Sequence, residues 1–104
     1  MDLYLLTWKT EHTRKMEVFR AFSEMTAADH AAAEEAAGIR IIVRVHSPSD
    51  GSGAGICEAA SVENVHAYCM NWAPFLNCTV TGVLDDAAAR KVTLAYLAST
   101  SGTI

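Results

Sequence analysis

Apolar and polar residues alternate most regularly between Ile39 and His46, and this alternation predicts a β-strand. Side chains in a strand point alternately to opposite faces, so these residues divide into two sets. One set consists of four β-branched residues, Ile39, Ile41, Val43 and Val45. The other set consists of Arg40, Ile42, Arg44 and His46. We therefore expect a strand that buries its β-branched face and leaves a mixed face open.

Three further strands are expected around this one. Residues 3–10 carry bulky side chains on both faces, so both faces of that strand should meet apolar partners. Residues 47–53 are rich in Ser, Pro, Asp and Gly, which favours a tight turn. Residues 54–60 then return as the second strand of a hairpin, and residues 78–84 form the fourth strand.

Helical spacing of apolar residues predicts two consecutive helices after the first strand. In residues 14–25 the apolar positions recur every three or four residues, and Thr13 is expected to cap this helix. Residues 27–37 are rich in alanine, which favours a second helix that begins after Thr26 and stops at Gly38.

Two more helices are expected in the second half of the chain. One begins after Ser61, a favourable cap, and continues up to Pro74, whose ring removes an amide donor from the helix. The acidic pair at 85–86 is expected to cap a last helix over residues 87–98, because acids are favourable at the positive end of a helix.

The order of these elements is strand–helix–strand followed by strand–helix–strand, which is the βαββαβ order of a ferredoxin-like fold. The expected class is α+β, with a four-stranded antiparallel sheet, an extra helix after the first helix and a C-terminal helix. Helices cover only one face of such a sheet, so the other face must be solvated or covered by a partner. We expect a homodimer that forms through this sheet face.

Length, charge and cysteine content narrow the class of protein. The 104 residues fit one domain, expected over residues 1–98, with a frayed tail at 99–104. The net charge is −4 and the basic residues are scattered, so no nucleic-acid partner is expected. A membrane partner is not expected either, since no long apolar run or basic amphipathic helix is present. Three cysteines without disulfide spacing favour reduced thiols and a cytoplasmic location.

Five short stretches carry a resemblance to a known family. They are Arg44–His46, Asp50–Gly53, Ile56–Glu58, Asn71–Ala73 and Val83–Asp86. Together they resemble short bacterial proteins of the domain-of-unknown-function family 3303, over residues 3–92. The resemblance implies a place in the dimeric α/β barrel superfamily, and so a fold and a dimer rather than an activity. That superfamily includes cofactor-independent monooxygenases, heme-degrading enzymes, lactone isomerases and ligand-binding regulatory domains.

His46 is the first candidate for chemistry, because it ends a strand beside the glycine-rich turn. Its imidazole could serve as a general base near neutral pH. Arg44 and Arg40, on the same predicted face, could hold a carboxylate or an oxyanion. The alternative is structural: His46 would bond to the turn backbone, and the two arginines would pair with Glu58 across the hairpin.

The cysteines offer two further candidates. Cys57 is expected opposite the strand of His46, and the two could form a nucleophile with its base, although a buried and inert thiol explains the same residue. His66 and Cys69 are three residues apart on a predicted helix and could supply two zinc ligands. A second pair with ligand spacing is absent, so we expect no metal and no cofactor.

Two aromatic pairs remain. The superfamily resemblance implies that Asn71 and Trp72 could position an aromatic substrate, as in some of its oxygenases. Trp72 also fits the core-facing stripe of its helix. Trp8 and Tyr4 could stack on a planar ligand, or they could seal a dimer interface.

The leading functional prediction is a homodimeric domain that binds a small, partly apolar and acidic molecule of unknown identity. The expected ligand contacts are Trp8, Arg44, His46 and Trp72. One alternative is a cofactor-independent oxygenase or isomerase, with His46 as the base and Asn71 as an orienting donor. A second alternative is a structural oligomerisation protein without a pocket.

Overall fold

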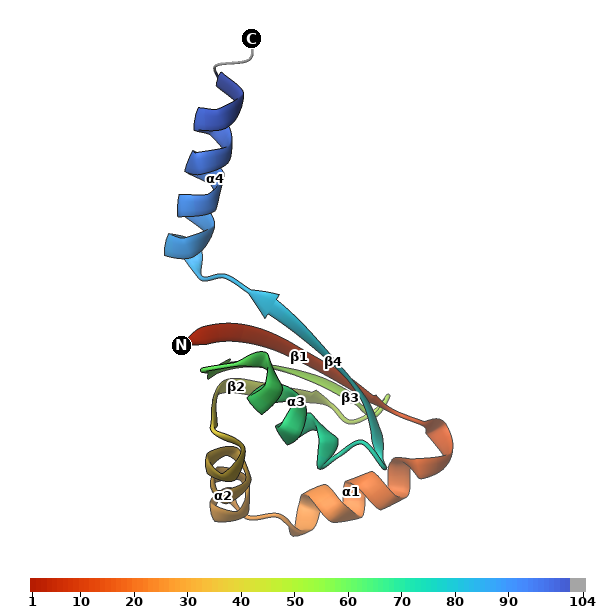
Figure 1. The fold of residues 1–104 in the computed structure, drawn as a ribbon. Coiled ribbons are helices and arrows are strands. Elements are labelled where there is room, and N and C mark those ends of the chain that lie inside the picture. The colour runs from red at the N-terminus through yellow and green to blue at the C-terminus, as the bar shows by residue number, and fades with distance from the viewer. Residues whose placement is uncertain (102–104) are drawn as a thin grey trace.

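Four strands form one antiparallel sheet in the order β2-β3-β1-β4 (Figure 1). The computed structural model describes residues 1–101. Its elements are β1 (Asp2–Thr10), a 3₁₀ turn (His12–Arg14), α1 (Lys15–Glu24), α2 (Ala27–Ala37), β2 (Ile39–Ser47), β3 (Ser52–Ala59), α3 (Val62–Met70), β4 (Leu76–Val83) and α4 (Asp86–Ser101). The strand order and antiparallel pairing confirm the predicted α+β, ferredoxin-like fold, with one additional helix after α1 and another at the C-terminal end.

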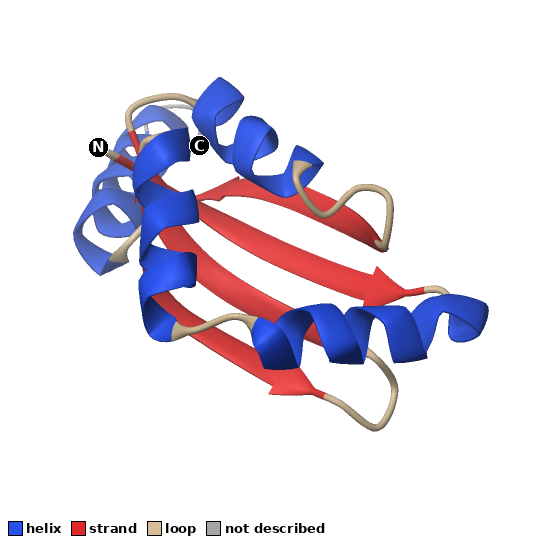
Figure 2. Cartoon of the chain, turned by 90° about the horizontal axis from the view of Figure 1, so that it is seen from below, coloured by secondary structure: helices blue, strands red, loops and turns tan. Residues whose placement is uncertain are grey.

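The first three helices lie on one face of the sheet, and the core forms between them (Figure 2). On β1 the residues at even positions point toward the helices, where Tyr4 is 7% and Leu6 is 2% exposed. Val65 of α3 is fully buried against this face. The residues at odd positions of β1, such as Leu3 and Leu5, point to the opposite face, the upper side of the sheet in Figure 1, from which α4 extends away. We call this opposite face the open sheet face.

A β-bulge in β2 changes which side chains reach the helices. Ile41 lies opposite Cys57, but the next paired residue is Val43, opposite Ile56, so Ile42 is the extra residue. A bulge of one residue turns all following side chains to the other face of the sheet. The predicted strict alternation is therefore wrong beyond Ile41. Val43 and Val45 belong to the open sheet face together with Arg40, whereas Arg44 and His46 lie on the helix-covered face with Ile39 and Ile41.

The predicted boundaries of α2 are confirmed, and the predicted cap of α1 is not. Thr26 and Asp29 form a capping box at the start of α2, with hydrogen bonds of 3.1 and 2.9 Å between each side chain and the other residue's amide. Gly38 ends α2 with a φ of 73°, a conformation that favours glycine. Thr13 does not cap α1, because a 3₁₀ turn precedes that helix and Arg14 takes the capping position without a side-chain bond.

The two threonines give a direct test of these helix ends. Replacing Thr26 by alanine removes an acceptor from the first turn of α2 and should lower the free energy of unfolding by about 1 kcal/mol. Replacing Thr13 by alanine is the matched control and should change it by less than about 0.5 kcal/mol. Urea denaturation followed by tryptophan fluorescence measures both. Equal losses in the two variants would contradict the assignment of the cap.

The third helix is shorter than predicted. It ends at Met70, and Trp72 belongs to a turn in which its amide donates to the Cys69 carbonyl over 3.0 Å. Pro74 cannot donate a backbone hydrogen bond, so the chain leaves the helix before it and β4 begins at Leu76. This turn places Trp72 beneath the sheet rather than on the outer part of a longer helix.

Helix α4 extends away from the sheet and from the other three helices (Figure 1). The chain is therefore elongated, with extents of 58 × 28 × 19 Å. The helix continues to Ser101, beyond the predicted end at Ala98, so residues 99–101 of the expected frayed tail at 99–104 are helical, and residues 102–104 lie outside the described residues. Within the described part of the chain, no helix is long and apolar enough to cross a membrane.

Candidate functional site

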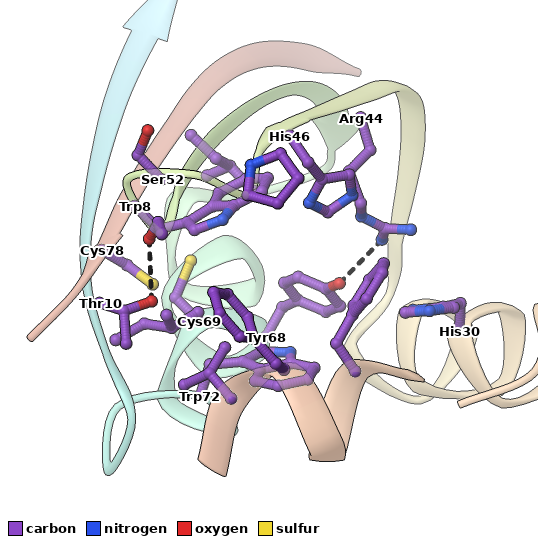
Figure 3. Close-up of a pocket in the computed structure, with 17 residues that line it drawn as sticks. Trp8, Thr10, His30, Arg44, His46, Ser52, Tyr68, Cys69, Trp72 and Cys78 are labelled. Atoms are coloured by element: carbon purple, nitrogen blue, oxygen red, sulfur yellow. Dashed lines mark hydrogen bonds between the residues drawn. The ribbon is translucent and has the colours of Figure 1, made fainter. Parts of the chain in front are cut away.

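A pocket of about 180 Å³ lies between the helix-covered face of the sheet and helix α1. Its wall is mostly apolar and draws on all four strands, with Ser52 the contribution of β3, and on the turn before β3. Phe19 and Phe22 of α1 close one side, and Tyr68 and Trp72 close another. The side chains of these elements converge on a common space in Figure 3. Segments from β1, α1, α2, the β2–β3 hairpin, α3 and β4 must therefore pack before the pocket exists.

The four predicted ligand contacts all lie in the wall of this pocket. Trp8 comes from β1, Arg44 and His46 from β2, and Trp72 from the turn after α3. Asn71, the proposed orienting donor, is exposed and does not line the pocket. The structure thus separates the two residues of the predicted catalytic pair, His46 and Asn71, and keeps the predicted binding set together.

A row of rings forms one side of the pocket. The ring centroids of Trp8 and His46 are 5.8 Å apart in an edge-to-face arrangement. Phe22 lies 4.7 Å from the His46 ring and 5.3 Å from the His30 ring. These spacings are those of contacting aromatic pairs, so the row offers flat surfaces to a planar molecule. Phe22 and His30 were missed as site residues, because a helical apolar stripe predicts only a packed face.

Trp8 can lie in this row because Gly53 faces it from β3. A Cβ atom at position 53 would come within 2.4 Å of the indole ring, closer than any real contact. The glycines of residues 47–53 were interpreted as turn formers, and Gly51 fits that role with a φ of 70°. Gly53 has a different role, which is to make room for the tryptophan on the neighbouring strand.

Arg44 is the principal charged group of the wall, and its side chain is 21% exposed. Its Nη2 donates to the Tyr68 hydroxyl over 2.9 Å and to Oε2 of Glu34 over 3.4 Å. The second oxygen of Glu34 accepts from the Ile41 amide over 3.3 Å, which fixes the carboxylate. Because a guanidinium has five N–H donors, this arrangement leaves donors for a ligand.

The predicted pairing with Glu58 is confirmed for Arg40 and wrong for Arg44. Arg40 Nε lies 2.6 Å from Glu58 Oε1 on the open sheet face, where the Arg40 side chain is 66% exposed. The bulge at Ile42 places Arg44 on the other face, where it reaches Glu34 instead. Two arginines four residues apart on one strand therefore have different surroundings.

The two histidines are further polar groups at this end of the pocket. Burial lowers the pKa of His46, and the charges of Arg44 and His30 lower it further, so the imidazole is neutral at pH 7. Nδ1 of His30 is buried and has no hydrogen-bond partner among the described residues. An unsatisfied buried nitrogen is costly unless something bonds to it, so this atom favours a polar group in the pocket.

The strand register contradicts the predicted pairing of Cys57 with His46. Cys57 lies opposite Ile41 and is fully buried, whereas His46 lies opposite Gly53, so the two cannot form a nucleophile with its base. Burial raises the pKa of the Cys57 thiol, which disfavours its reactive form.

The predicted zinc pair is separated as well. His66 is exposed on α3, while Cys69 is buried on the pocket side. Cys69 instead meets Cys78 of β4, and the hydrogen bond between the two thiols raises the pKa of Cys69 and lowers that of Cys78. Over residues 1–101 no three His, Cys, Asp or Glu side chains come together in a way that could hold a metal ion.

The fold and the pocket define a class: a ferredoxin-like α+β domain with a small, mostly apolar pocket between its sheet and its helices. Residues 2–97 match the family described as "Domain of unknown function (DUF3303)", and the chain belongs to that family. This confirms the resemblance seen in the five sequence stretches.

Other comparisons give little beyond the fold. A crystal structure of a dimeric ferredoxin-like protein from an uncultured marine organism is 14% identical, with a TM-score of 0.45. The alignment covers 83% of this chain and 95% of that one. No curated protein matches the sequence.

Proposed function

We propose that the protein is a small-molecule-binding domain whose pocket takes a compact, mostly apolar molecule with one acidic group. The observation that carries this proposal is the position of Arg44. The bulge in β2 turns this arginine into an apolar, ring-lined pocket, where part of its guanidinium remains without a protein partner. Burying a charge is costly, and a ligand carboxylate would compensate that cost.

The volume limits the size of the ligand. Drug-sized ligands occupy pockets of about 300–1,000 Å³, whereas a cavity of about 150 Å³ holds a benzene molecule. The pocket measures about 180 Å³ and therefore suits a single ring with a short substituent. Ring faces on Trp8 and Phe22 favour a planar molecule within this size range.

The charged groups around the pocket determine which ligand charge is preferred. Arg44, His46 and His30 surround one end of the pocket, where Arg44 carries the positive charge and forms an ion pair with Glu34. Hydrogen bonds in which both partners are charged are shorter and stronger than neutral ones. An aromatic carboxylate meets all of these conditions, with its ring against the rings of the wall and its oxygens toward Arg44.

Tryptophan fluorescence provides the test, because the two tryptophans of the chain, Trp8 and Trp72, both line the pocket. Benzoate is the probe, and benzyl alcohol, which has the same ring without the charge, is the matched control. We expect benzoate to change the emission saturably and to bind at least about tenfold more tightly than benzyl alcohol, because of its charged hydrogen bonds. Equal affinities, or no saturable response to either compound, would contradict the proposal.

The pH dependence of binding follows from His46. Burial lowers its pKa from the ordinary histidine value, which favours the neutral imidazole in the free protein. A carboxylate beside the ring would favour the protonated form and raise this pKa, so binding would take up a proton. By linkage, benzoate should then bind more tightly as the pH falls from about 7.5 to about 6, where a carboxylate is still ionised.

Titrations at several pH values check this direction. Benzyl alcohol should show no trend over the same range, and His46→Gln should flatten the benzoate profile. Benzoate binding that weakens as the pH falls would contradict the predicted sign.

Of the two residues predicted for the enzymatic alternative, only His46 lies in the pocket. A neutral imidazole at pH 7 could accept a proton, which favours His46 as a base. Because Asn71 lies outside the pocket, the proposed orienting donor would have to be another group, and Tyr68 is the nearest candidate on the Arg44 side. Binding without turnover therefore remains the leading proposal.

The proposed assembly is a homodimer formed through the open sheet face, as in the dimeric α/β barrel superfamily. The half-buried and exposed apolar residues on that face support it, since a solvated sheet face would carry more polar residues. A reducing compartment such as the cytoplasm is the proposed location, supported by three unpaired cysteines.

A further inference from the structure

Because of helix α4, the radius of gyration and the accessible surface are larger than those of a compact protein of the same mass. The radius of gyration is 17.2 Å, compared with about 13 Å for a compact chain of this length. The accessible surface is 6969 Å², and a monomeric protein of 11.2 kDa is expected to expose about 5,700 Å². The excess of about 1,300 Å² per chain is surface that folding of a single copy leaves uncovered.

The outer part of α4 is poorly suited to water. No charged residue occurs from Val92 to Ser101. Val92 is 59% exposed, Tyr96 is 65% exposed, and Leu94 and Leu97 are each 53% exposed. These side chains point in several directions around the axis, and a helix that is apolar on most sides is normally buried. Helices in proteins gain most of their stability from packing of an apolar face, and α4 lacks such packing in the single chain. Helix α4 therefore requires a partner surface.

The open sheet face supplies a surface of matching chemistry. Its central row crosses all four strands and consists of Val43, Ile56, Leu5 and Thr81. The neighbouring rows are Val45, Ala54, Thr7 and Thr79 on one side and Arg40, Glu58, Leu3 and Val83 on the other. The centre is thus apolar, and the ion pair between Arg40 and Glu58 lies at one corner. An apolar centre with charges at its margin is typical of an interface.

The start of α4 directs it away from its own sheet. Only Leu84 and Asp85 connect β4 to the helix. The Asp85 carboxylate accepts from the Ala88 amide over 2.8 Å, and its carbonyl accepts from the Ala89 amide over 2.9 Å. Packing α4 onto its own open sheet face would reverse the chain within this two-residue connection. The same face on a second copy requires no such reversal.

We propose that α4 of one chain packs across the open sheet face of a second copy, and that the second copy returns the same contact. This inference rests on the homodimer of the proposed function and names the element that completes it. A reciprocal contact is self-complementary, as a twofold dimer requires. Covering the excess surface on both chains would bury about 2,600 Å², which lies in the range of obligate homodimers.

Two double variants separate the two halves of this contact. The helix variant is Val92→Lys with Tyr96→Lys, and the face variant is Val43→Glu with Thr81→Glu. All four side chains are exposed in the single chain, so neither change removes a core contact. Analytical ultracentrifugation of the full-length chain should show a dimer, and each variant alone should dimerise at least about 100-fold more weakly.

Mixing the two variants is the decisive step. The intact helix of the face variant can pack on the intact face of the helix variant, and the introduced lysines meet the introduced glutamates in the other half. We therefore expect a heterodimer from two chains that are monomeric alone. The matched control, Ala28→Glu with Ala67→Glu, adds the same charge on the helix side and should leave the dimer unchanged.

The possible failures are distinguishable. A weak dimer has a Kd of about 50 µM. A wild-type chain that is still monomeric at this concentration would overturn both the homodimer and this inference. A helix variant that dimerises like wild type would overturn the role of α4 and leave the homodimer through the sheet. Two monomeric variants that fail to associate on mixing would show that α4 does not pack on the partner's sheet.

Discussion

Replacing Arg44 by methionine should weaken benzoate binding by about 10- to 150-fold, the effect of losing one or two charge-assisted hydrogen bonds. Methionine keeps much of the apolar stem and removes the guanidinium, so the volume of the pocket changes little. The variant should also be less stable, by about 1–3 kcal/mol, because Glu34 loses its cation and Tyr68 loses a donor while both stay largely covered.

Arg40→Met is the matched control for this prediction. It removes the same group from the same strand, but Arg40 lies on the open sheet face and pairs with Glu58 near solvent. Exposed ion pairs contribute about 0–1 kcal/mol, so this variant should bind benzoate within about twofold of wild type. Fluorescence titration and urea denaturation measure both properties. Arg44→Met with unchanged benzoate affinity would refute the assigned role of Arg44.

Replacing Gly53 by alanine should cost about 1–3 kcal/mol of stability and disturb the pocket. The new Cβ would lie 2.4 Å from Trp8 Cζ2 and 2.5 Å from Cε2, so the indole must move. Because the strand behind it is fixed by its pairing, the ring can move only toward the pocket and away from its contact with His46. The fluorescence of Trp8 should change, and benzoate should bind less tightly.

Gly82→Ala provides the comparison on the same face of the sheet. A Cβ at position 82 meets nothing within 4 Å. The substitution reduces the freedom of the unfolded chain, so it should be neutral or stabilising by about 0.4–1 kcal/mol. Thermal denaturation of the two variants gives the answer. If Gly53→Ala were as stable as Gly82→Ala, with unchanged emission, the close approach of Trp8 to Gly53 would not hold in solution.

Much of the fold could be predicted from residue periodicity. Each strand and each of the main helices lies within a few residues of its expected position, because alternation and helical spacing are properties of the chain itself. The caps at Thr26 and Ser61 were recognised for the same reason, since a capping side chain bonds to amides two or three residues further on.

The error in assigning the faces of β2 has a local cause that the alternation of apolar and polar residues does not reveal. Residues 39–46 alternate as well as a regular strand, and nothing in their composition marks Ile42 as the extra residue of a bulge. The bulge is visible only in the pairing of β2 with β3, and it turns Arg44 and His46 toward the helices. Its effect is large, since it exchanges Val43 and Val45 for Arg44 and His46 on the covered face.

The sequence predicted four residues of the candidate site, but not the residues that surround them. Trp8, Arg44, His46 and Trp72 were chosen for their chemistry, and all four line one pocket. Their neighbours Phe22, His30, Glu34 and Tyr68 come from three helices. No spacing in the sequence connects them to β1 or β2, because only packing brings such distant segments together.

The sequence by itself determined the α+β class, the order of the elements, the family and four candidate residues that line one pocket. These depend on local periodicity, capping and side-chain chemistry. Only the tertiary structure decided which face each residue of β2 occupies, how large the pocket is and what Arg44 bonds to. It also decided that α4 extends away from the domain with its apolar side chains exposed. These depend on strand register and on contacts between segments far apart in the chain, and a shift of one residue in register reverses every face.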